Sequence, residues 1–174
     1  MSARRRGVRV CTIGVYGASR ETFFEALERA RADVLIDIRR RRAVRGPRYT
    51  FANATRLIAE LERRGIAYHH ELGLAPTAAM LALQHEADAA AKQRYSERTK
   101  LAPEYVKRYT AQVLKRFDFA ALAGELTGFR APVLLCIERL PAACHRSLAA
   151  PLLARALGTD QVEHLVPDES SAPA

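Results

Sequence analysis

The chain has 174 residues, enough for one domain with a single hydrophobic core, and its formal net charge is +9. The excess of arginine favours nucleic acid or a phosphorylated small molecule as a partner, although solvated surface charge explains it as well. The three cysteines do not form a disulfide framework, and no apolar run reaches the roughly twenty residues that span a membrane, so we expect a cytoplasmic protein without membrane contact.

The first predicted elements are a basic leader, a strand and a helix. Residues 1–7 form a short flexible leader, and the β-branched run at 8–13 predicts the first strand. Gly14 and Gly17 then make a strand-to-helix turn, with Ser19 as the expected N-cap of the helix. A single Gly-x-x-Gly is weak support for phosphate binding, since a tight turn accounts for it equally well.

An arginine-rich loop follows the second predicted strand, 34–38. The strand is compact and apolar as far as Asp37, which is typical of a strand covered on both faces in a parallel sheet. From Arg39 onward, arginines that include Arg45 are interleaved with turn formers and aromatic residues such as Tyr49. Such a loop suits a phosphate-rich ligand whose bases stack. A solvated arginine loop, with its aromatic residues packed on the next helix, fits equally well.

The third predicted strand, 66–69, follows a helix that Asn53 is expected to cap. It runs into His69, His70 and Glu71, again at the carboxyl end of a strand. Adjacent side chains of a strand point to opposite faces, so at most one of these histidines serves a site directly. A structural, hydrogen-bonded histidine is the more common alternative.

A long helical segment separates the third strand from the fourth. Alanine-rich periodicity predicts a helix from about 76 to 91, and apolar spacing predicts two more between Pro103 and Gly128. This insertion resembles a lid, but a packed helical layer is the simpler interpretation.

The fourth predicted strand, 133–137, leads to the most reactive stretch of the sequence. After a polar loop with a proline, a helical pattern opens with Cys144, His145, Arg146 and Ser147. Helix N-termini present unpaired N–H groups and positive dipole, which favour an anion or a thiolate. We therefore expect an anion site at this corner.

The last predicted elements complete an α/β domain. Pro151 suggests that the helix after the reactive stretch begins late. Residues 162–166 predict a fifth strand at the sheet edge, and 168–174 a disordered polar tail. The alternation of elements predicts a single domain over 8–167, built on an open, mostly parallel sheet of about five strands flanked by helices.

Ligands of open parallel sheets bind beyond the carboxyl ends of the strands, near the point where the strand order reverses. If the first and fourth strands are neighbours there, polar side chains from distant segments collect at one edge. The members of this predicted rim are Thr12, Gly14, Asp37, Arg39, His69 or His70, Glu71, Cys136, Glu138, Cys144, His145, Arg146 and Ser147.

Two kinds of chemistry follow from the charged members of the rim. Glu138 near His145 forms a candidate acid/base pair, or else a structural carboxylate that caps the helix. Arg39 and Arg146 can clamp a phosphate or carboxylate, with Asp37 orienting one of them.

Cys144 offers a third chemistry, because His145 and Arg146 beside it lower the pKa of a thiol and permit a nucleophile. However, the adjacent Cys-His-Arg-Ser does not reproduce the active-site loop of phosphatases or sulfurtransferases, and most cysteines are packing residues. The spacing of Cys136, Cys144 and His145 matches no zinc motif, so no metal site is predicted. No motif identifies a cofactor or an oligomeric state.

Several of these motifs together resemble a known family. They are Thr12-Ile13-Gly14, Asp37-Ile38-Arg39, Tyr68-His69 before Glu71-Leu72, and Leu135-Cys136-Ile137-Glu138 leading to Cys144-His145-Arg146-Ser147. From about Val8 to Gly158 the chain resembles domain of unknown function 488, and its Arg40 to Tyr49 loop resembles the arginine-rich branch of that family. The resemblance implies a small α/β domain with no settled activity. Its characteristic positions here are Gly14, Asp37, Arg39, Arg45, Glu71, Glu138, Cys144, His145, Arg146 and Ser147.

Our leading hypothesis is a cytosolic protein that binds a phosphate-bearing ligand, nucleic acid or a nucleotide, at the rim of the sheet. Glu138 and His145 are then available for acid/base chemistry. One alternative is a thiol-dependent enzyme that uses Cys144. The other is a non-catalytic module whose basic loop docks an acidic partner.

Overall fold

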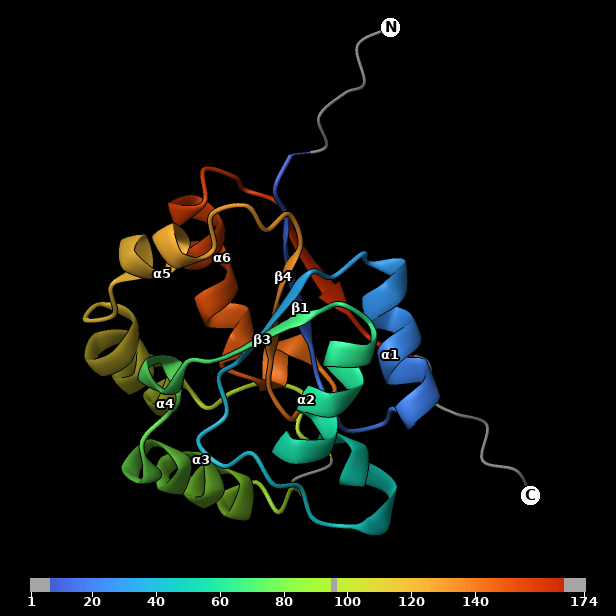
Figure 1. Cartoon of the computed structure of the whole chain (residues 1–174). Helices are drawn as coiled ribbons and strands as arrows, with labels where there is room; N and C mark the ends of the chain where they lie inside the picture. The colour runs from blue at the N-terminus through green and yellow to red at the C-terminus, as the bar shows by residue number, and fades with distance from the viewer. Residues whose placement is uncertain (1–6, 95–96, 168–174) are drawn as a thin grey trace, which may run out of the picture.

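Strands and helices alternate through residues 7–94 and 97–167, the part of the chain that the computed structural model describes (Figure 1). The predicted tail, and the predicted leader apart from Gly7, lie outside the described residues. In chain order the elements are β1 (Val10–Ile13), α1 (Arg20–Arg29), β2 (Val34–Asp37), η1 (Pro47–Ala52), α2 (Ala54–Arg63), β3 (Ala67–His70), η2 (Leu72–Leu74), α3 (Ala78–Ala90), α4 (Pro103–Tyr109), the π-helical η4 (Thr110–Leu114), α5 (Phe119–Glu125), β4 (Pro132–Leu135), η5 (Pro141–Ala143), α6 (Arg146–Ala156) and β5 (Val162–Leu165).

The strands form one sheet in the order β3-β2-β4-β1-β5, and every pairing is parallel. The predicted α/β open sheet is therefore confirmed, including β5 at an edge. Every residue of β1, β2 and β4 is buried, whereas β3 and β5 are largely exposed or half-buried. The three inner strands are apolar on both faces because helices cover both faces.

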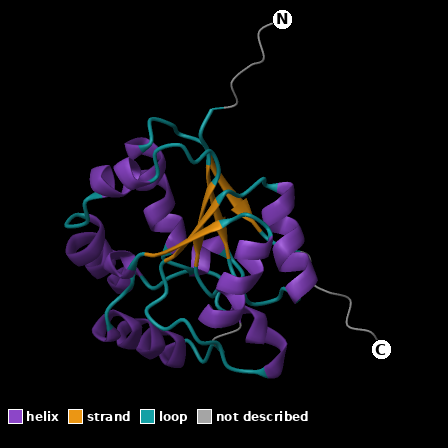
Figure 2. Cartoon of the chain, in the orientation of Figure 1, coloured by secondary structure: helices purple, strands orange, loops and turns teal. Residues whose placement is uncertain are grey.

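Two helical layers cover the sheet, and they differ in size (Figures 1 and 2). Phe23 of α1 and Leu57 of α2 pack with Leu35 on one face. The other face, which includes Ile36, is covered by α3 to α6 and η4. The predicted helical insertion is therefore a packed layer, since buried residues such as Tyr109 belong to the core. Among the described residues, no helix has both the length and the apolar character that crossing a membrane requires.

At the neighbouring strands β1 and β4, the connections to the next strand leave in opposite directions across the sheet. From β1 the chain passes through α1 to β2, and from β4 it passes through α6 to β5, on the opposite face. Diverging connections of this kind leave a site beyond the carboxyl ends of the strands. The first and fourth strands are thus neighbours, as the predicted rim requires.

Two details differ from the sequence prediction. Pro151 does not delay α6, which begins at Arg146 with Pro151 exposed inside it. The first turn is already closed, because the Ser147 amide donates to the Cys144 carbonyl at 3.2 Å. Asn53 occupies the N-cap of α2 without capping it, since its Oδ1 accepts from the Val44 amide at 2.7 Å and so anchors the arginine loop.

Glu60 of α2 joins the two helices of the smaller layer through three arginines. Its carboxylate accepts from Arg20 of α1, at 3.2 Å from Nε, and from Arg64 and Arg63 of its own helix. Hydrogen bonding from Arg20 outweighs burial and, with the bonds from Arg64 and Arg63, lowers the pKa of Glu60 to about 2.

This lowered pKa predicts acid sensitivity of the α1–α2 layer. The ionised Glu60 contributes stability above its usual pKa of 4.5, and that contribution is lost as the pH falls from 4.5 towards 2. Chemical unfolding measured across this pH range should therefore lose stability less steeply in Glu60→Gln than in the wild type. Exposed Glu62 on the same helix provides the control, Glu62→Gln. Equal slopes for Glu60→Gln and the wild type would contradict the prediction.

Candidate functional site

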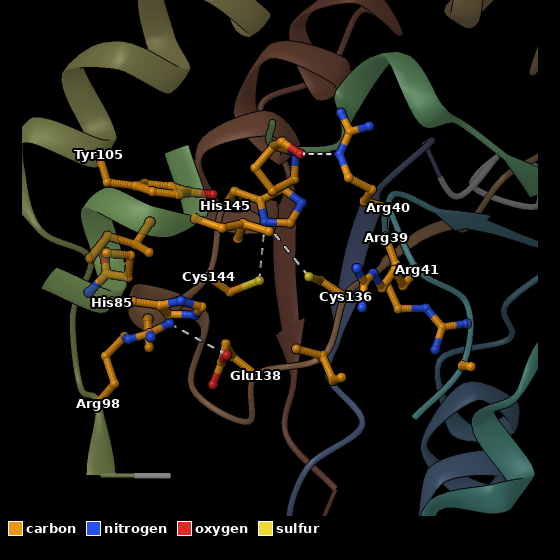
Figure 3. A pocket seen from close by; sticks show the side chains of 17 residues that line it. Arg39, Arg40, Arg41, His85, Arg98, Tyr105, Cys136, Glu138, Cys144 and His145 are labelled. Carbon is orange, nitrogen blue, oxygen red and sulfur yellow. Dashed lines mark hydrogen bonds and ion pairs between the residues drawn. The ribbon is translucent and has the colours of Figure 1, made fainter. Parts of the chain in front are cut away.

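A pocket of about 270 Å³ opens at the carboxyl ends of β2 and β4, on the side of the larger helical layer. Three segments line it: the loop after β2, the insertion that contains α3 and α4, and the loop from β4 to α6 (Figure 3). Its lining includes five members of the predicted rim, Arg39, Cys136, Glu138, Cys144 and His145. The predicted meeting of the arginine loop with the Cys-His-Arg-Ser corner is thus present in the structure.

The base of the pocket carries two thiols and an imidazole that point towards one another (Figure 3). Cys136 directly follows β4 and is held against β1, because its amide donates to the Ile13 carbonyl at 3.1 Å. Cys144 and His145 lie between η5 and α6. His145 Nδ1 is 3.7 Å from Cys136 Sγ and 3.9 Å from Cys144 Sγ. All three residues are buried.

The orientation of His145 is fixed by its other ring nitrogen and by an aromatic neighbour. Nε2 lies 3.3 Å from the Ile38 carbonyl, and the Tyr109 ring packs edge-on at 5.3 Å between centroids. A carbonyl only accepts, so in the neutral imidazole Nε2 carries the proton and Nδ1 faces the thiols with its lone pair. Both ring nitrogens of His145 thus have partners other than Glu138, with which an acid/base pair was predicted.

The two thiols at the base differ in pKa. Burial raises the pKa of Cys144, but the hydrogen bond from Cys136, the neighbouring imidazole of His145 and the guanidinium charge of Arg146 outweigh it and hold the pKa well below its usual range. Donation of that hydrogen bond, together with burial, raises the pKa of Cys136. The pair therefore favours a thiolate at Cys144 that accepts from the Cys136 thiol.

Arg146 builds the loop behind the base. Its guanidinium is fully buried and donates to the carbonyls of Glu138 and Arg139, at 2.5 and 2.9 Å, and to Thr12 Oγ1 at 3.3 Å. Gly14 permits this close packing of the β1 and β4 ends, since a Cβ there would lie 1.8 Å from the Glu138 oxygen. The guanidinium of Arg146 thus faces protein oxygens, and its role as an anion ligand stays a prediction.

Arg39 likewise faces protein oxygens, although it lines the pocket. Its Nε and Nη2 donate to the two carboxylate oxygens of Asp37 at 2.8 and 2.7 Å, and Nη1 donates to the Ala52 carbonyl at 2.9 Å. The Tyr68 hydroxyl also donates to Asp37, at 2.8 Å. Arg39 and Asp37 are 3% and 0% exposed, so this pair ties the strand end to η1 and β3.

The remaining charged lining comes from the arginine loop and from the insertion. Arg40 and Arg41 stand exposed on the loop, and Arg40 Nε donates to the Pro76 carbonyl at 2.6 Å. Arg98 Nη1 lies 3.5 Å from Glu138 Oε1, and Arg98 Nε is also 3.0 Å from Asp88 Oδ2.

Sequence reasoning missed the insertion as a source of pocket residues, whose polar members are Gln84, His85, Arg98 and Tyr105. The sequence does carry one signal for these residues. Gln84 and Asp88 are polar and lie four residues apart on an alanine-rich helix, so they share the helix face that carries pocket residues. Both side chains are buried, and Gln84 Nε2 donates to Asp88 Oδ1 at 2.9 Å.

Gly14, Asp37 and Arg146 do not line the pocket, and neither do four other predicted site residues. Glu71 caps η2 by accepting from the Gly73 amide at 2.9 Å. Tyr49 packs against the Tyr16 ring at 5.1 Å, and Arg45 is exposed on the same loop. Ser147 donates to the Cys144 carbonyl at 2.9 Å. Whether any of them contacts a ligand remains a prediction.

The structure alters the argument about metals that was drawn from spacing. The ligand atoms of Cys136, Cys144 and His145 all lie within 4.8 Å of one another. Zinc motifs in a sequence usually place two ligands on one short turn. Here the strand-to-helix loop from Cys136 to Cys144 brings the sulfur and nitrogen atoms together, so the spacing matches no such motif. These three residues are therefore candidates for holding a metal ion.

Residues 19–153 match the family model described as "Domain of unknown function DUF488". No curated protein and no solved structure shows a significant match. The family match spans the larger part of the chain, from the N-cap of α1 into α6.

Proposed function

The chain belongs to the DUF488 family, whose description assigns no activity, and we propose that it binds a small phosphate-bearing molecule in the pocket beyond β2 and β4. The observation that carries this proposal is the pair of exposed arginines, Arg40 and Arg41, on the wall of a cavity with a buried thiol–imidazole base. Arg41 forms no hydrogen bond or ion pair with the described residues and is available to a ligand. Guanidinium groups bind phosphate with paired, charge-assisted hydrogen bonds.

The size and lining of the pocket favour a small molecule over a nucleic acid duplex. A volume of about 270 Å³ is near the lower end of ligand pockets, which hold roughly 300–1,000 Å³. Leu81, Leu101 and Ile137 add apolar wall, which suits a ligand with an apolar part beside its phosphate. A nucleotide or a phosphorylated metabolite has both features. Because the three cysteines are free thiols, we further propose a cytoplasmic location.

Binding of a panel of phosphate compounds tests the proposal. Calorimetric titration with inorganic phosphate, mononucleotides, sugar phosphates and single-stranded oligonucleotides should identify a small ligand whose binding weakens with salt. Arg41→Ala should weaken it about tenfold or more, since a hydrogen bond to a charged group contributes about 1.5–3 kcal/mol. Arg155→Ala is the matched control, because Arg155 is exposed on α6 away from the pocket lining.

Two results would contradict the proposal. One is the absence of binding to every small phosphate compound. The other is equal affinity of Arg41→Ala and Arg155→Ala for the ligand found. Tight, salt-dependent binding confined to the oligonucleotides would instead identify the arginine loop as a nucleic-acid surface and remove the pocket from the function.

A further inference from the structure

The base of the pocket has the donors of a metal centre, and we propose that Cys136, Cys144 and His145 bind one zinc ion with the fourth coordination position open to the pocket. This inference goes beyond phosphate binding and does not depend on it. Thiolate sulfur and imidazole nitrogen are the donors that zinc prefers in proteins.

The separations of the donor atoms suit tetrahedral coordination. Zinc–sulfur and zinc–nitrogen bonds of about 2.3 and 2.0–2.1 Å, at the tetrahedral angle, place sulfur and nitrogen about 3.6 Å apart. The Nδ1–Sγ distances of His145 are 3.7 Å to Cys136 and 3.9 Å to Cys144. Shifts of a few tenths of an ångström at these two contacts would therefore bring the triad of Cys136, Cys144 and His145 into contact with one ion. The two sulfur atoms lie within 4.8 Å of each other in the structure.

His145 is held in the orientation that a zinc ligand needs. A ligating histidine usually donates its second ring N–H to a carbonyl or carboxylate, which fixes the tautomer and raises the basicity of the ligating nitrogen. The Ile38 carbonyl fills this role at 3.3 Å from Nε2, and the Tyr109 ring restrains the plane of the imidazole. The nitrogen left free of a proton, Nδ1, is the one that faces both sulfurs.

The charge behind the site favours deprotonated sulfur. Arg146 is fully buried, and its partners among the described residues, the carbonyls of Glu138 and Arg139 and the Thr12 hydroxyl, are neutral acceptors. A buried guanidinium without a carboxylate partner stabilises nearby anions, and thiolates are the form of cysteine that binds a metal. Zn²⁺ and two thiolates are neutral together, so an anionic ligand or hydroxide at the open position would offset the positive charge of Arg146.

The open position distinguishes this centre from a structural zinc site. Structural sites have four protein ligands, whereas three protein ligands and one exchangeable position are typical of catalytic zinc. All three donors belong to the lining of the pocket, so the fourth position faces the cavity (Figure 3). The centre would thus polarise whatever group of a ligand reaches the base.

Metal uptake by the full-length reduced protein tests the site. After removal of metal with a chelator, the protein should bind one equivalent of Zn²⁺, and Cys136 and Cys144 should then react with a thiol reagent more slowly than in the metal-free protein. Co²⁺ in place of Zn²⁺ should give thiolate-to-metal charge transfer and the intense visible bands of tetrahedral cobalt. Cys136→Ala and Cys144→Ala should each bind more than about 100-fold more weakly, since even changes to groups behind the ligands cost about 10- to 100-fold.

Cys11 provides the matched control, since it is buried on the opposite face of the sheet, in the core cluster that also contains residues of α1 and α2. Cys11→Ala and Arg41→Ala should bind zinc like the wild type, which separates this test from that of phosphate binding. The wild-type cobalt spectrum decides the question even if a triad variant fails to fold. Absence of uptake by the wild type, a spectrum without thiolate charge transfer, or undiminished uptake by Cys144→Ala would overturn the proposal.

Discussion

Replacing Asp37 with alanine is expected to lower the free energy of unfolding by about 3–5 kcal/mol, the usual cost of removing one partner of a buried ion pair. Asp37 has no exposed surface, and its carboxylate accepts from two nitrogens of Arg39 and from the Tyr68 hydroxyl. Without it, the guanidinium of Arg39 remains buried and keeps, among the described residues, the Ala52 carbonyl as its one hydrogen-bond partner. Urea unfolding followed by circular dichroism measures the loss.

A double variant shows whether the loss comes from the unpaired charge. Asp37→Leu combined with Arg39→Met should recover about half of the loss, because apolar residues can replace a buried ion pair at small cost. Recovery stays incomplete, since the Tyr68 hydroxyl and the Arg39 amide lose their acceptor. The surface pair of Arg9 with Glu163 is the control, and Glu163→Ala should cost less than about 1 kcal/mol. An Asp37→Ala cost as small as that of Glu163→Ala would show that the pair does not hold the strand end.

Gly14→Ala is expected to destabilise the protein and to disrupt the base of the pocket together. The added methyl group would lie 1.8 Å from the Glu138 carbonyl oxygen and 2.7 Å from its carbon, so the ends of β1 and β4 must separate. The cost should reach or exceed the upper end of the roughly 1–3 kcal/mol that overpacking usually causes. Separation would also shift the loop that carries Glu138 and reaches Cys144, so zinc uptake should weaken with stability.

Gly124 provides the matched control for this substitution. It lies inside α5, and a Cβ there meets no atom within 4 Å. Gly124→Ala should therefore stabilise the protein by about 0.5–1 kcal/mol, because alanine loses less conformational freedom in a helix. Thermal unfolding of both variants makes the comparison. Equal stability of Gly14→Ala and the wild type would show that the β1 and β4 ends are not in close contact.

Local sequence patterns predicted the sheet and its inner strands well. The run at 34–38 indicated a strand covered on both faces because residues buried from both sides cannot be polar at alternate positions. Polar residues such as Asp37 and Glu138 at or just after strand ends, and Cys144 before the next helix, placed the predicted site at the carboxyl rim. The insertion was recognised as helical, but alanine-rich periodicity does not reveal which of its polar residues face a pocket, as Gln84 and Arg98 do.

The sequence by itself determined the parallel α/β fold, the edge of the sheet that carries the reactive side chains, and the membership of Cys144 and His145 in that edge. Only the tertiary structure decided the partner of each group: Arg146 with loop carbonyls, Arg39 with Asp37, and His145 with the two thiols. The physical reason is that strand and helix patterns depend on neighbours a few positions away. The contacts of the site, by contrast, join residues such as Ile38 and His145, 107 positions apart, and depend on strand order and on how the helical layers pack.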